Sequence, residues 1–228
     1  MTTTNNPLTD LYYKHEGKVM VKWHHYLDIY HRHFEQFRAV ATPANPIILW
    51  EIGVENGGSL DMWLKYFGKE NCVIYGIDIN PKCLMLMKGL DPNIHIVIGD
   101  QGNLDFLKNL TATLPPPHII IDDGGHYPHQ QKNSFQILFP FLRPGGVYVC
   151  EDCHTSYWPD FYGGVKQAGT FVEYSKDLID SINSYHHRPP VTSTCYAMHV
   201  YDSVFVFDKV EPQPPPTYSI VGTEKIIG

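Results

Sequence analysis

The sequence lacks the features of a membrane-spanning or secreted protein. No stretch of its 228 residues approaches 18 consecutive apolar positions, and residues 1–7 contain neither a basic nor an apolar segment. A membrane helix or a secretory signal would need such segments, so we expect a soluble, cytoplasmic protein. Positive charge is also scarce: 17 Lys and Arg stand against 24 Asp and Glu, which gives a net charge of −7. Nucleic acids and anionic membranes bind basic surfaces, so we expect neither as a partner.

A regular cysteine framework is absent as well. The chain has five cysteines, an odd number, and Cys150 and Cys153 form a single CxxC pair. A zinc site built on this pattern needs a second such pair, which the chain does not have. The residues between the two cysteines, Glu151 and Asp152, are acidic, and acidic neighbours raise the pKa of a thiol. We therefore do not expect a redox role for this pair.

The sequence does contain enough apolar material for a large core. Hydrophobic residues make up 43% of the chain and charged residues 18%, which fits one large folded domain. Apolar side chains recur at i, i+3, i+4 and i+7 over residues 22–38, which predicts an amphipathic helix. We therefore divide the chain into a lead-in with this helix at 1–44, a folded domain at 45–210 and a Pro-rich tail at 211–228.

Short apolar runs alternate with helical patterns through the middle of the chain. The predicted strands are 47–52, 72–77, 94–98, 118–121 and 147–150, and the predicted helices are 60–67, 81–88, 104–110 and 130–141. Apolar strands separated by helices indicate a parallel sheet covered on both faces. With right-handed crossovers, this predicts a doubly wound α/β fold.

The pattern changes after residue 150. Residues 157–169 are aromatic and Gly-rich, which indicates an irregular insert, and 170–185 is a predicted helix. Two final strands at 195–201 and 204–207 are expected to be antiparallel, which gives a mostly parallel, seven-stranded sheet. The large apolar side chains expected in the core rather than in a site are Trp50, Trp63, Met85 and Met87.

Carboxylates gather where the five parallel strands end. In an open parallel sheet, ligands bind outside the carboxyl ends of the strands. Each of the five predicted strands ends in at least one acidic residue, which is improbable by chance for 24 acids in 228 residues. A single Asp at such a position is often a helix cap, but acids at all five ends favour a binding site.

The first of these strand ends resembles a nucleotide-binding loop without matching it. Glycines stand at 53, 57 and 58, but position 55 is Glu, where a dinucleotide fingerprint has its second glycine. A carboxylate there repels phosphate, whereas Asp78 is placed to accept hydrogen bonds from ribose hydroxyls. A ligand with a ribose but no phosphate fits, and S-adenosylmethionine (SAM) is such a ligand. Asp100 would then accept a hydrogen bond from the adenine amino group.

The last two parallel strands predict a metal site. Asp123 follows the fourth strand, and Glu151 and Asp152 follow the fifth, so neighbouring strands would bring three carboxylates together. Such a group needs a cation, and oxygen ligands favour Mg²⁺, although a solvated acidic rim is the alternative. His126, on a Gly-Gly turn three residues after Asp123, is our candidate for a general base.

At this point several motifs resemble a known family, the class I SAM-dependent methyltransferases. They are EIGVENGGSL (51–60), YGID (75–78), GDQ (99–101), IDDGGH (121–126), PGGVY (144–148) and EDCHTSYW (151–158). More narrowly, these motifs resemble the Mg²⁺-dependent, mycinamicin-type sugar O-methyltransferases of macrolides and other polyketides. The resemblance covers residues 15–208 and implies a SAM-binding catalytic domain at 45–210.

The resemblance implies a residue for each part of the site. His126 would be the base, and Asp123, Glu151 and Asp152 would hold Mg²⁺. The cofactor side is assigned to Glu51, Gly53, Gly57, Ser59, Asp78, Asp100, Gln101 and Asp122. We expect no counterpart of the long N-terminal auxiliary domain of the mycinamicin-type enzymes. The acceptor pocket, expected at 155–170 and in parts of the first helix, does not align.

The implied activity is SAM-dependent methylation of a hydroxyl on a small natural product, most simply a sugar of a glycosylated polyketide. A catechol-type O-methyltransferase is the first alternative, since the aromatics at 157–162 can stack on a planar acceptor or on a sugar face. A SAM-binding accessory protein without turnover, or a relative similar to cephalosporin hydroxylases, is the second. The expected partner is a small glycoside or polyol, and a homo-oligomer stays open.

Overall fold

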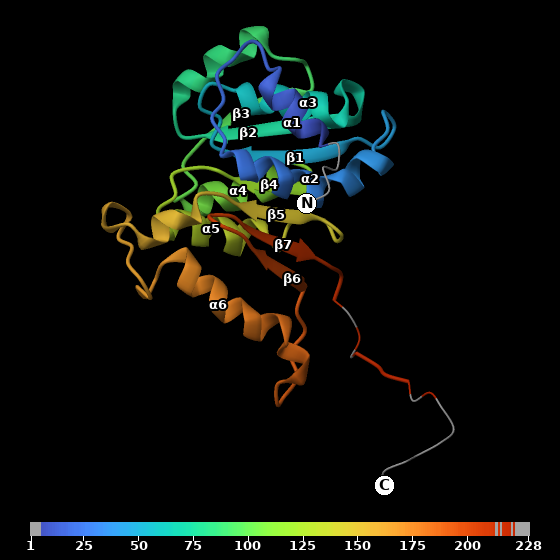
Figure 1. The fold of residues 1–228 in the computed structure, drawn as a ribbon, viewed down its shortest axis with the longest axis vertical. Helices are drawn as coiled ribbons and strands as arrows, with labels where there is room; N and C mark the ends of the chain where they lie inside the picture. The colour runs from blue at the N-terminus through green and yellow to red at the C-terminus, as the bar shows by residue number, and fades with distance from the viewer. Residues whose placement is uncertain (1–5, 213, 215, 220, 222–228) are drawn as a thin grey trace.

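One seven-stranded sheet runs through the computed structural model, which describes residues 6–212, 214, 216–219 and 221 (Figure 1). The spatial order of the strands is β3-β2-β1-β4-β5-β7-β6. Their bounds are Ile47–Ile52 (β1), Cys72–Asp78 (β2), Ile94–Ile98 (β3), Ile119–Asp122 (β4), Val147–Cys150 (β5), Cys195–Val200 (β6) and Phe205–Lys209 (β7). The first five are parallel, and β7 and β6 join antiparallel, so the predicted fold class is confirmed.

The strand order reverses between β1 and β4. From β1 the chain moves outward through β2 to β3, then returns to the other side of β1 for β4 and β5. Ile52 pairs with Ile77 on one side and with Asp122 on the other, so these strands end level with one another. A reversal of this kind leaves a crevice at the carboxyl ends, where such sheets bind ligands.

Helices cover both faces of the sheet (Figure 1). One face packs against α1 (Pro7–Tyr13), α2 (His24–Val40) and α3 (Gly58–Phe67), and the other against α4 (Leu104–Thr113), α5 (Pro128–Leu138) and α6 (Phe171–Ile182). Alternate residues of β1 point to the two layers: Leu49 joins the first core cluster and Trp50 the second. Both faces of β1 are therefore buried, which explains its uninterrupted apolar sequence.

Local sequence sets where several helices begin. The side chain of Asn103 accepts hydrogen bonds from the backbone N–H groups of Asp105 and Phe106 at the start of α4. Thr170 caps α6 in the same way through the N–H of Glu173. These side chains satisfy donors that have no partner within the helix.

One predicted helix has a different geometry. Residues 81–88 form a 3₁₀ helix, η2 (Pro81–Gly89), in place of an α-helix. With three residues per turn, Cys83 and Leu86 face the core together, and Met85 and Met87 point to solvent. The expected burial of these two methionines was therefore wrong, whereas Trp50 and Trp63 are fully buried as expected.

The segment after β5 is irregular, as expected. It contains the short 3₁₀ turns η3 (Cys153–Tyr157) and η4 (Pro159–Phe161); two further turns are η1 (Lys69–Asn71) and η5 (Ser184–His186). All five cysteines are unpaired and buried, and burial raises the pKa of the Cys150 thiol well above its ordinary value. Much of the tail at 211–228 lies outside the described residues, and the division into three parts stays a prediction.

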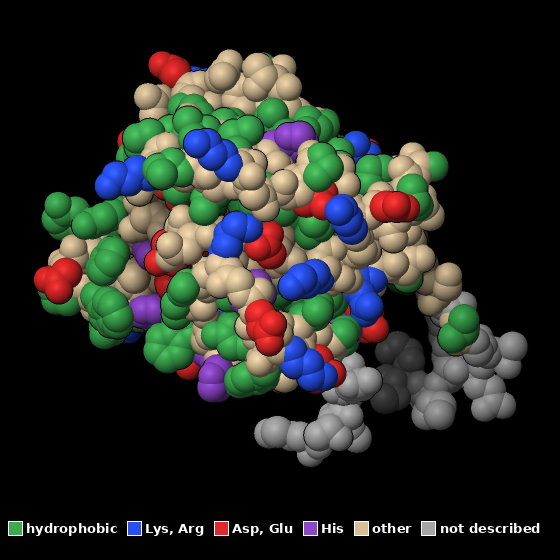
Figure 2. Space-filling view, turned by 90° about the horizontal axis from the view of Figure 1, so that it is seen from above, with side chains coloured by type: hydrophobic (Ala, Val, Ile, Leu, Met, Phe, Trp, Pro, Cys, Tyr) green, Lys and Arg blue, Asp and Glu red, His purple; other side chains and the backbone are tan. Residues whose placement is uncertain are grey.

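The charge on the described surface and the character of its helices bear on whether nucleic acids or membranes are partners. Basic side chains are interspersed with acidic ones on the face seen in Figure 2. Among the helices that the structure describes, we find none with the length and apolar character needed to cross a bilayer.

Candidate active site

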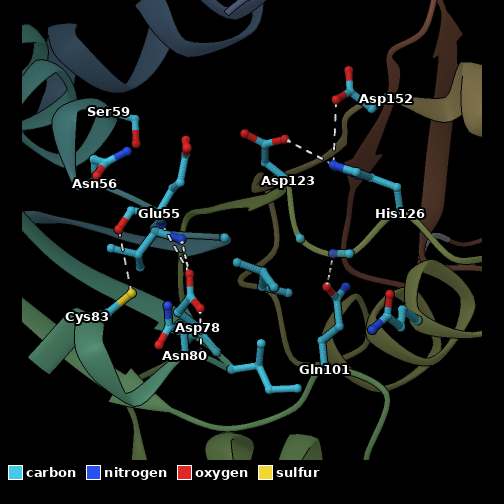
Figure 3. Close-up of a pocket in the computed structure, with 18 of the residues that line it drawn as sticks. Glu55, Asn56, Ser59, Asp78, Asn80, Cys83, Gln101, Asp123, His126 and Asp152 are labelled. Carbon is cyan, nitrogen blue, oxygen red and sulfur yellow. Dashed lines mark hydrogen bonds and ion pairs between the residues drawn. The ribbon is translucent and has the colours of Figure 1, made fainter. Parts of the chain in front are cut away.

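A cavity of about 670 Å³ lies at the carboxyl edge of the sheet, beside the reversal of strand order (Figure 3). Its volume suits a ligand of cofactor size. Eight of the predicted site residues line it: Gly53, Ser59, Asp78, Asp100, Gln101, Asp123, His126 and Asp152. The other four, Glu51, Gly57, Asp122 and Glu151, are not among the lining residues. Predicted carboxylates from the ends of four strands, β2, β3, β4 and β5, therefore line one cavity.

Asp78 is fixed at one side of this cavity (Figure 3). Its Oδ2 accepts hydrogen bonds from the backbone N–H groups of Val54 (2.9 Å) and Glu55 (3.1 Å), and its Oδ1 from that of Asn80 (2.7 Å). The carboxylate therefore braces the loop after β1 and has a fixed orientation. These three bonds use both lone pairs of Oδ2 and one of Oδ1, so the second lone pair of Oδ1 is left to accept from a ligand hydroxyl.

Two glycines let the loops after β1 and β4 touch. A Cβ on Gly53, whose φ is +93°, would lie 2.0 Å from the carbonyl oxygen of Asp123. A Cβ on Gly124 would lie 1.7 Å from Oε1 of Gln101. A side chain at 53 would push the loop after β4 away, whereas one at 124 would displace the amide of Gln101. Glycine at 53 therefore allows Asp123 to reach the cavity.

Gln101 and Asp122 form the wall behind the cavity. The Gln101 amide donates to Oδ1 of Asp122 (2.9 Å) and accepts from the N–H of Gly125 (2.8 Å), and the Tyr148 hydroxyl donates to Oδ2 of Asp122 (2.9 Å). Burial raises the pKa of Asp122 to about 6. Through Gln101, Asp122 thus supports the Gly-Gly turn at 124–125. The sequence did not predict this supporting role, because Asp122 directly precedes Asp123 in the same motif.

Glu51 and Gly57 support the pocket from the other side. Glu51 is fully buried and accepts hydrogen bonds from the Ser59 hydroxyl (2.9 Å) and the Trp63 indole N–H (3.2 Å). Burial raises its pKa to about 7. Gly57, with a φ of +78°, turns the chain into α3 as its N-cap. These contacts position Ser59, which does line the cavity.

Asp123, His126 and Asp152 face one another at the other side of the cavity (Figure 3). Nε2 of His126 lies 3.9 Å from Oδ1 of Asp123 and 3.6 Å from Oδ2 of Asp152. Ligand atoms of all three lie within 4.8 Å of one another, as a metal site requires. His126 and Asp152 both have positive φ angles, +58° and +51°, a backbone strain that often accompanies functional positions.

Lys22 enters this acidic group from the lead-in segment. Its side chain is 3% exposed, and its ammonium contacts Asp123, both oxygens of Glu151 (2.9 and 3.1 Å) and, at 3.9 Å, Glu51. Burial lowers the pKa of Lys22, but the charges of the three carboxylates outweigh that effect and hold the pKa well above its ordinary value. Lys22 therefore stays charged and neutralises part of the acidic group.

One ammonium leaves this group short of positive charge. Four carboxyl groups surround it: those of Glu51, Asp123, Glu151 and Asp152. Burial and the charge of Asp123 raise the pKa of Glu151, as expected where negative charge is in excess. Nδ1 of His126 is buried without a partner among the described residues. The oxygen donors and the excess of negative charge fit a hard divalent cation such as Mg²⁺.

The sequence did not single out Lys22 or Tyr26 for the site. The Tyr26 hydroxyl, on the first turn of α2, donates to Oδ1 of Asp152 (2.7 Å) and so orients that carboxylate. Lys22 is 101 residues from Asp123 in the chain. No local motif marks either residue. A lysine directly before an aromatic helix, in a chain with acids at five strand ends, was nevertheless a signal for a buried ion pair.

An aromatic rim and a second cavity lie beside the carboxylates. The ring of His154 contacts those of Trp158 (4.5 Å) and Trp23 (6.2 Å), and its Nδ1 lies 3.9 Å from Oδ1 of Asp152. His154 also lines a cavity of about 520 Å³ whose other walls include Val172 and Met198. An apolar space therefore begins two residues past Asp152.

Comparison with known proteins identifies the family of this chain. Residues 50–153 match the family model for a methyltransferase domain. The 8-demethyl-8-alpha-L-rhamnosyl tetracenomycin-C 2'-O-methyltransferase of Streptomyces olivaceus is 35% identical over 205 residues, which cover 82% of this chain and 51% of that protein. The mycinamicin VI 2''-O-methyltransferase of Micromonospora griseorubida is 35% identical over 203 residues, covering 82% and 48%. The chain thus spans about half the length of the curated relatives it matches.

A solved structure shows the same fold. The MycE methyltransferase from the mycinamycin biosynthetic pathway, in complex with Mg, SAH and mycinamycin VI, superposes with a TM-score of 0.75 at 32% identity. The match covers 90% of this chain and 53% of that one. Sequence, fold and the acidic cavity at the strand ends agree, and the chain belongs to the class I SAM-dependent methyltransferases.

Proposed function

We propose that this chain catalyses SAM- and Mg²⁺-dependent methylation of a hydroxyl on a sugar of a glycosylated polyketide. The observation that carries the proposal is the convergence of Asp123, His126 and Asp152 at one side of a cofactor-sized cavity. The relatives support the substrate class: one is named for a rhamnosyl tetracenomycin, and MycE was solved with mycinamycin VI.

The cavity divides into a cofactor side and a reacting side. Asp78 would accept a hydrogen bond from a ribose hydroxyl through Oδ1, and Asp100, whose Oδ1 is held by the N–H of Gly102 (2.7 Å), would accept from the adenine amino group. SAM, when bound, supplies a methyl group on a cationic sulfur. The acidic lining favours that cation, and Glu55 at the rim disfavours a phosphorylated nucleotide in its place.

The reacting side would hold the metal and the acceptor. Asp123 and Asp152 face the cavity, whereas Glu151 is 1% exposed and pairs with Lys22, so its place among the metal ligands stays a prediction. Mg²⁺, when bound, lowers the pKa of a hydroxyl beside it. Tyr26 and Lys22 fix the two carboxylates that would hold it.

His126 would act as the base through Nε2. That atom lies beside Asp123 and Asp152 at the reacting side of the cavity, whereas Nδ1 is buried. Nε2 would take the proton of the acceptor hydroxyl, and the electron pair left on that oxygen would form the new bond to the methyl carbon as the carbon–sulfur bond breaks. Much of the acceleration would come from holding the two reactants in line.

The aromatic rim and the second cavity suit the acceptor. Trp23 and Trp158 are about half exposed beside His154, and an aromatic face can stack on a sugar. The 520 Å³ cavity next to them has space for part of an apolar aglycone. The same rim could take a planar catechol, so the acceptor class needs a direct test.

The test is a methyl-transfer assay with purified chain, SAM and two acceptor panels, rhamnosyl polyketide glycosides and simple catechols. We expect transfer to glycosides with excess Mg²⁺ and none with EDTA. Preference for catechols would assign the catechol-type activity. SAM binding without transfer to either panel, with or without metal, would favour an accessory protein and overturn the proposal.

A further inference from the structure

A second cluster of metal-binding side chains lies away from the cavity. One ring nitrogen each of His33 and His199 and one carboxylate oxygen of Asp208 lie within 4.8 Å of one another. Nε2 of His199 is 2.8 Å from Oδ2 of Asp208, and the two imidazole rings are 4.7 Å apart, centre to centre. Three potential ligands from three elements, α2, β6 and β7, therefore meet at one point.

The register of the outer strands separates this cluster from the proposed active site. Asp208 pairs with Val147, the first residue of β5, whereas Glu151 follows the last residue of the same strand. Val147 and Glu151 are four residues apart, which is about 13 Å along a strand, so Asp208 lies about that far from the carboxyl end. His199 lies one strand further out, on β6, the edge strand of the sheet (Figure 1). The cluster is thus on the α2 face near the outer edge.

The three side chains are held differently. His33 is buried, and its Nε2 lies 2.9 Å from the Tyr201 hydroxyl, which fixes the plane of the ring. The side chains of His199 and Asp208 are 39% and 30% exposed and can adjust. Ligand atoms around a zinc ion with bonds of 2.0–2.2 Å are about 3.3 Å apart. Shifts of about an ångström in these two partly exposed side chains therefore reach that geometry.

The ligand types select the metal. Two imidazoles and one carboxylate suit Zn²⁺ and similar transition ions, whereas Mg²⁺ prefers oxygen ligands alone. We propose that His33, His199 and Asp208 form a second metal site, specific for Zn²⁺ over Mg²⁺, that fastens α2 to the outer strand pair β6–β7. This site does not depend on the proposed methyltransferase chemistry.

A metal in this position would brace a helix that reaches the active site. His33 and Tyr26 are on the same helix, two turns apart, and Tyr26 bonds to Asp152. Outside the metal cluster, α2 contacts the turn between β6 and β7 through His25, whose ring lies 3.0 Å from the carbonyl oxygen of Asp202. A bond from the middle of α2 to β6 and β7 would therefore limit its movement.

The experiment titrates Zn²⁺ into the metal-stripped full chain by calorimetry, in excess Mg²⁺ to saturate the carboxylate site. Co²⁺ replaces Zn²⁺ in a parallel titration, because its visible d–d bands report nitrogen ligands and low coordination number. We expect one Zn²⁺ per chain, intense Co²⁺ bands, and a thermal midpoint that Zn²⁺ raises by several degrees. No stoichiometric Zn²⁺ binding by the unmodified chain would overturn the proposal.

Variants assign the site. His199→Gln and Asp208→Asn change the two more exposed ligands, and we expect each to weaken Zn²⁺ binding by about 100-fold or more. His95→Gln, on the exposed face of β3, is the matched histidine control and should bind as the unmodified chain does. Asp152→Asn should also keep the Zn²⁺ site. Equal affinity in all four variants, or loss in Asp152→Asn alone, would place the ion elsewhere and refute this assignment.

Discussion

The two ends of the parallel strands are built for different tasks. At the carboxyl end, five acidic side chains line one cavity, and Lys22 and His126 line it as well. The amino end is closed by short turns and neutral bonds: the N–H of His118 donates to the carbonyl of Ile48 (2.8 Å), and Nδ1 of His118 accepts from the N–H of Ile48 (3.0 Å).

The difference shows how one sheet separates stability from chemistry. At the carboxyl end, burial and like charge raise the pKa values of Glu51 and Glu151. Such groups destabilise the fold unless a cation balances them, and active sites commonly tolerate that loss. At the amino end, His118 and the backbone of Ile48 satisfy each other with two neutral hydrogen bonds. Changes at the two ends should therefore alter different measured quantities.

The largest expected effect is at the carboxyl end, in His126→Ala. Loss of a general base lowers turnover by about 10²–10⁴-fold, while SAM affinity should stay within a factor of two or three. Single-turnover kinetics with saturating SAM and acceptor, together with SAM calorimetry, measure both. His129→Ala, which changes an exposed histidine on the first turn of α5, is the control and should retain turnover. Unchanged turnover in His126→Ala would remove this residue as the base.

Lys22→Met should destabilise the fold. It leaves the buried Glu151 and the partly buried Asp123 without their counterion, which lowers the free energy of unfolding by about 3 kcal/mol at pH 7. Chemical denaturation measures this loss, and added Mg²⁺ should restore part of it by supplying positive charge. Lys18→Met is the control: its ion pair with Asp61 is about a quarter exposed, so the loss there should be below about 1 kcal/mol. Equal losses in both variants would contradict a special role for Lys22.

Asp78→Ala should separate cofactor binding from chemistry. It removes the predicted ribose acceptor and the brace of the loop after β1, so SAM affinity should fall by about 10- to 100-fold. Turnover at saturating SAM should change much less, because the reacting side is untouched. The informative control is Asp78→Asn, which keeps one acceptor oxygen and should show a smaller loss. Loss of turnover with normal SAM binding would place Asp78 on the reacting side and contradict its assignment to the cofactor side.

The smallest effect is expected at the amino end, as a pH dependence of stability. Burial, and then the charge of Arg143, lower the pKa of His118 from 6.5 to about 4. Between these values the unfolded chain binds a proton that the folded chain does not, so stability falls as pH falls from 6.5 towards 4. The contribution is on the order of 2 kcal/mol after allowance for partial exposure.

His118→Asn tests this dependence, because its Oδ1 can replace Nδ1 as the acceptor from Ile48. Denaturation curves at pH 7 and pH 5 should show a smaller loss for the variant than for the unmodified chain. If the variant and the unmodified chain lose the same stability between pH 7 and pH 5, groups other than His118 cause the pH dependence. Turnover at pH 7 should not change, which would confirm that the two ends of the sheet are independent.

Much of the candidate site was predictable because it is local in the sequence. An apolar run followed by an acid marks the end of a buried strand, and Asp78, Asp123 and Asp152 were found in this way. Their convergence follows from the parallel sheet. The assignment of η2 failed because the spacing of Cys83 and Leu86 is compatible with two helix types, and the apolar character of Met85 and Met87 hid the difference.

Other parts were not predictable from local pattern. Lys22 meets its carboxylates across 101 and 129 residues of chain, and His33 meets His199 only where α2 crosses the outer strands. Glu51 and Asp122 stand at strand ends like the others, but the structure turns their side chains into the wall.

The sequence by itself determined the alternation of strands and helices, the class of fold and the edge of the sheet that carries the acids, because burial and strand ends leave periodic, local signatures. Only the tertiary structure decided which acids face the cavity, which cation balances them and which histidines meet, because such contacts join side chains that become neighbours only when the chain has folded.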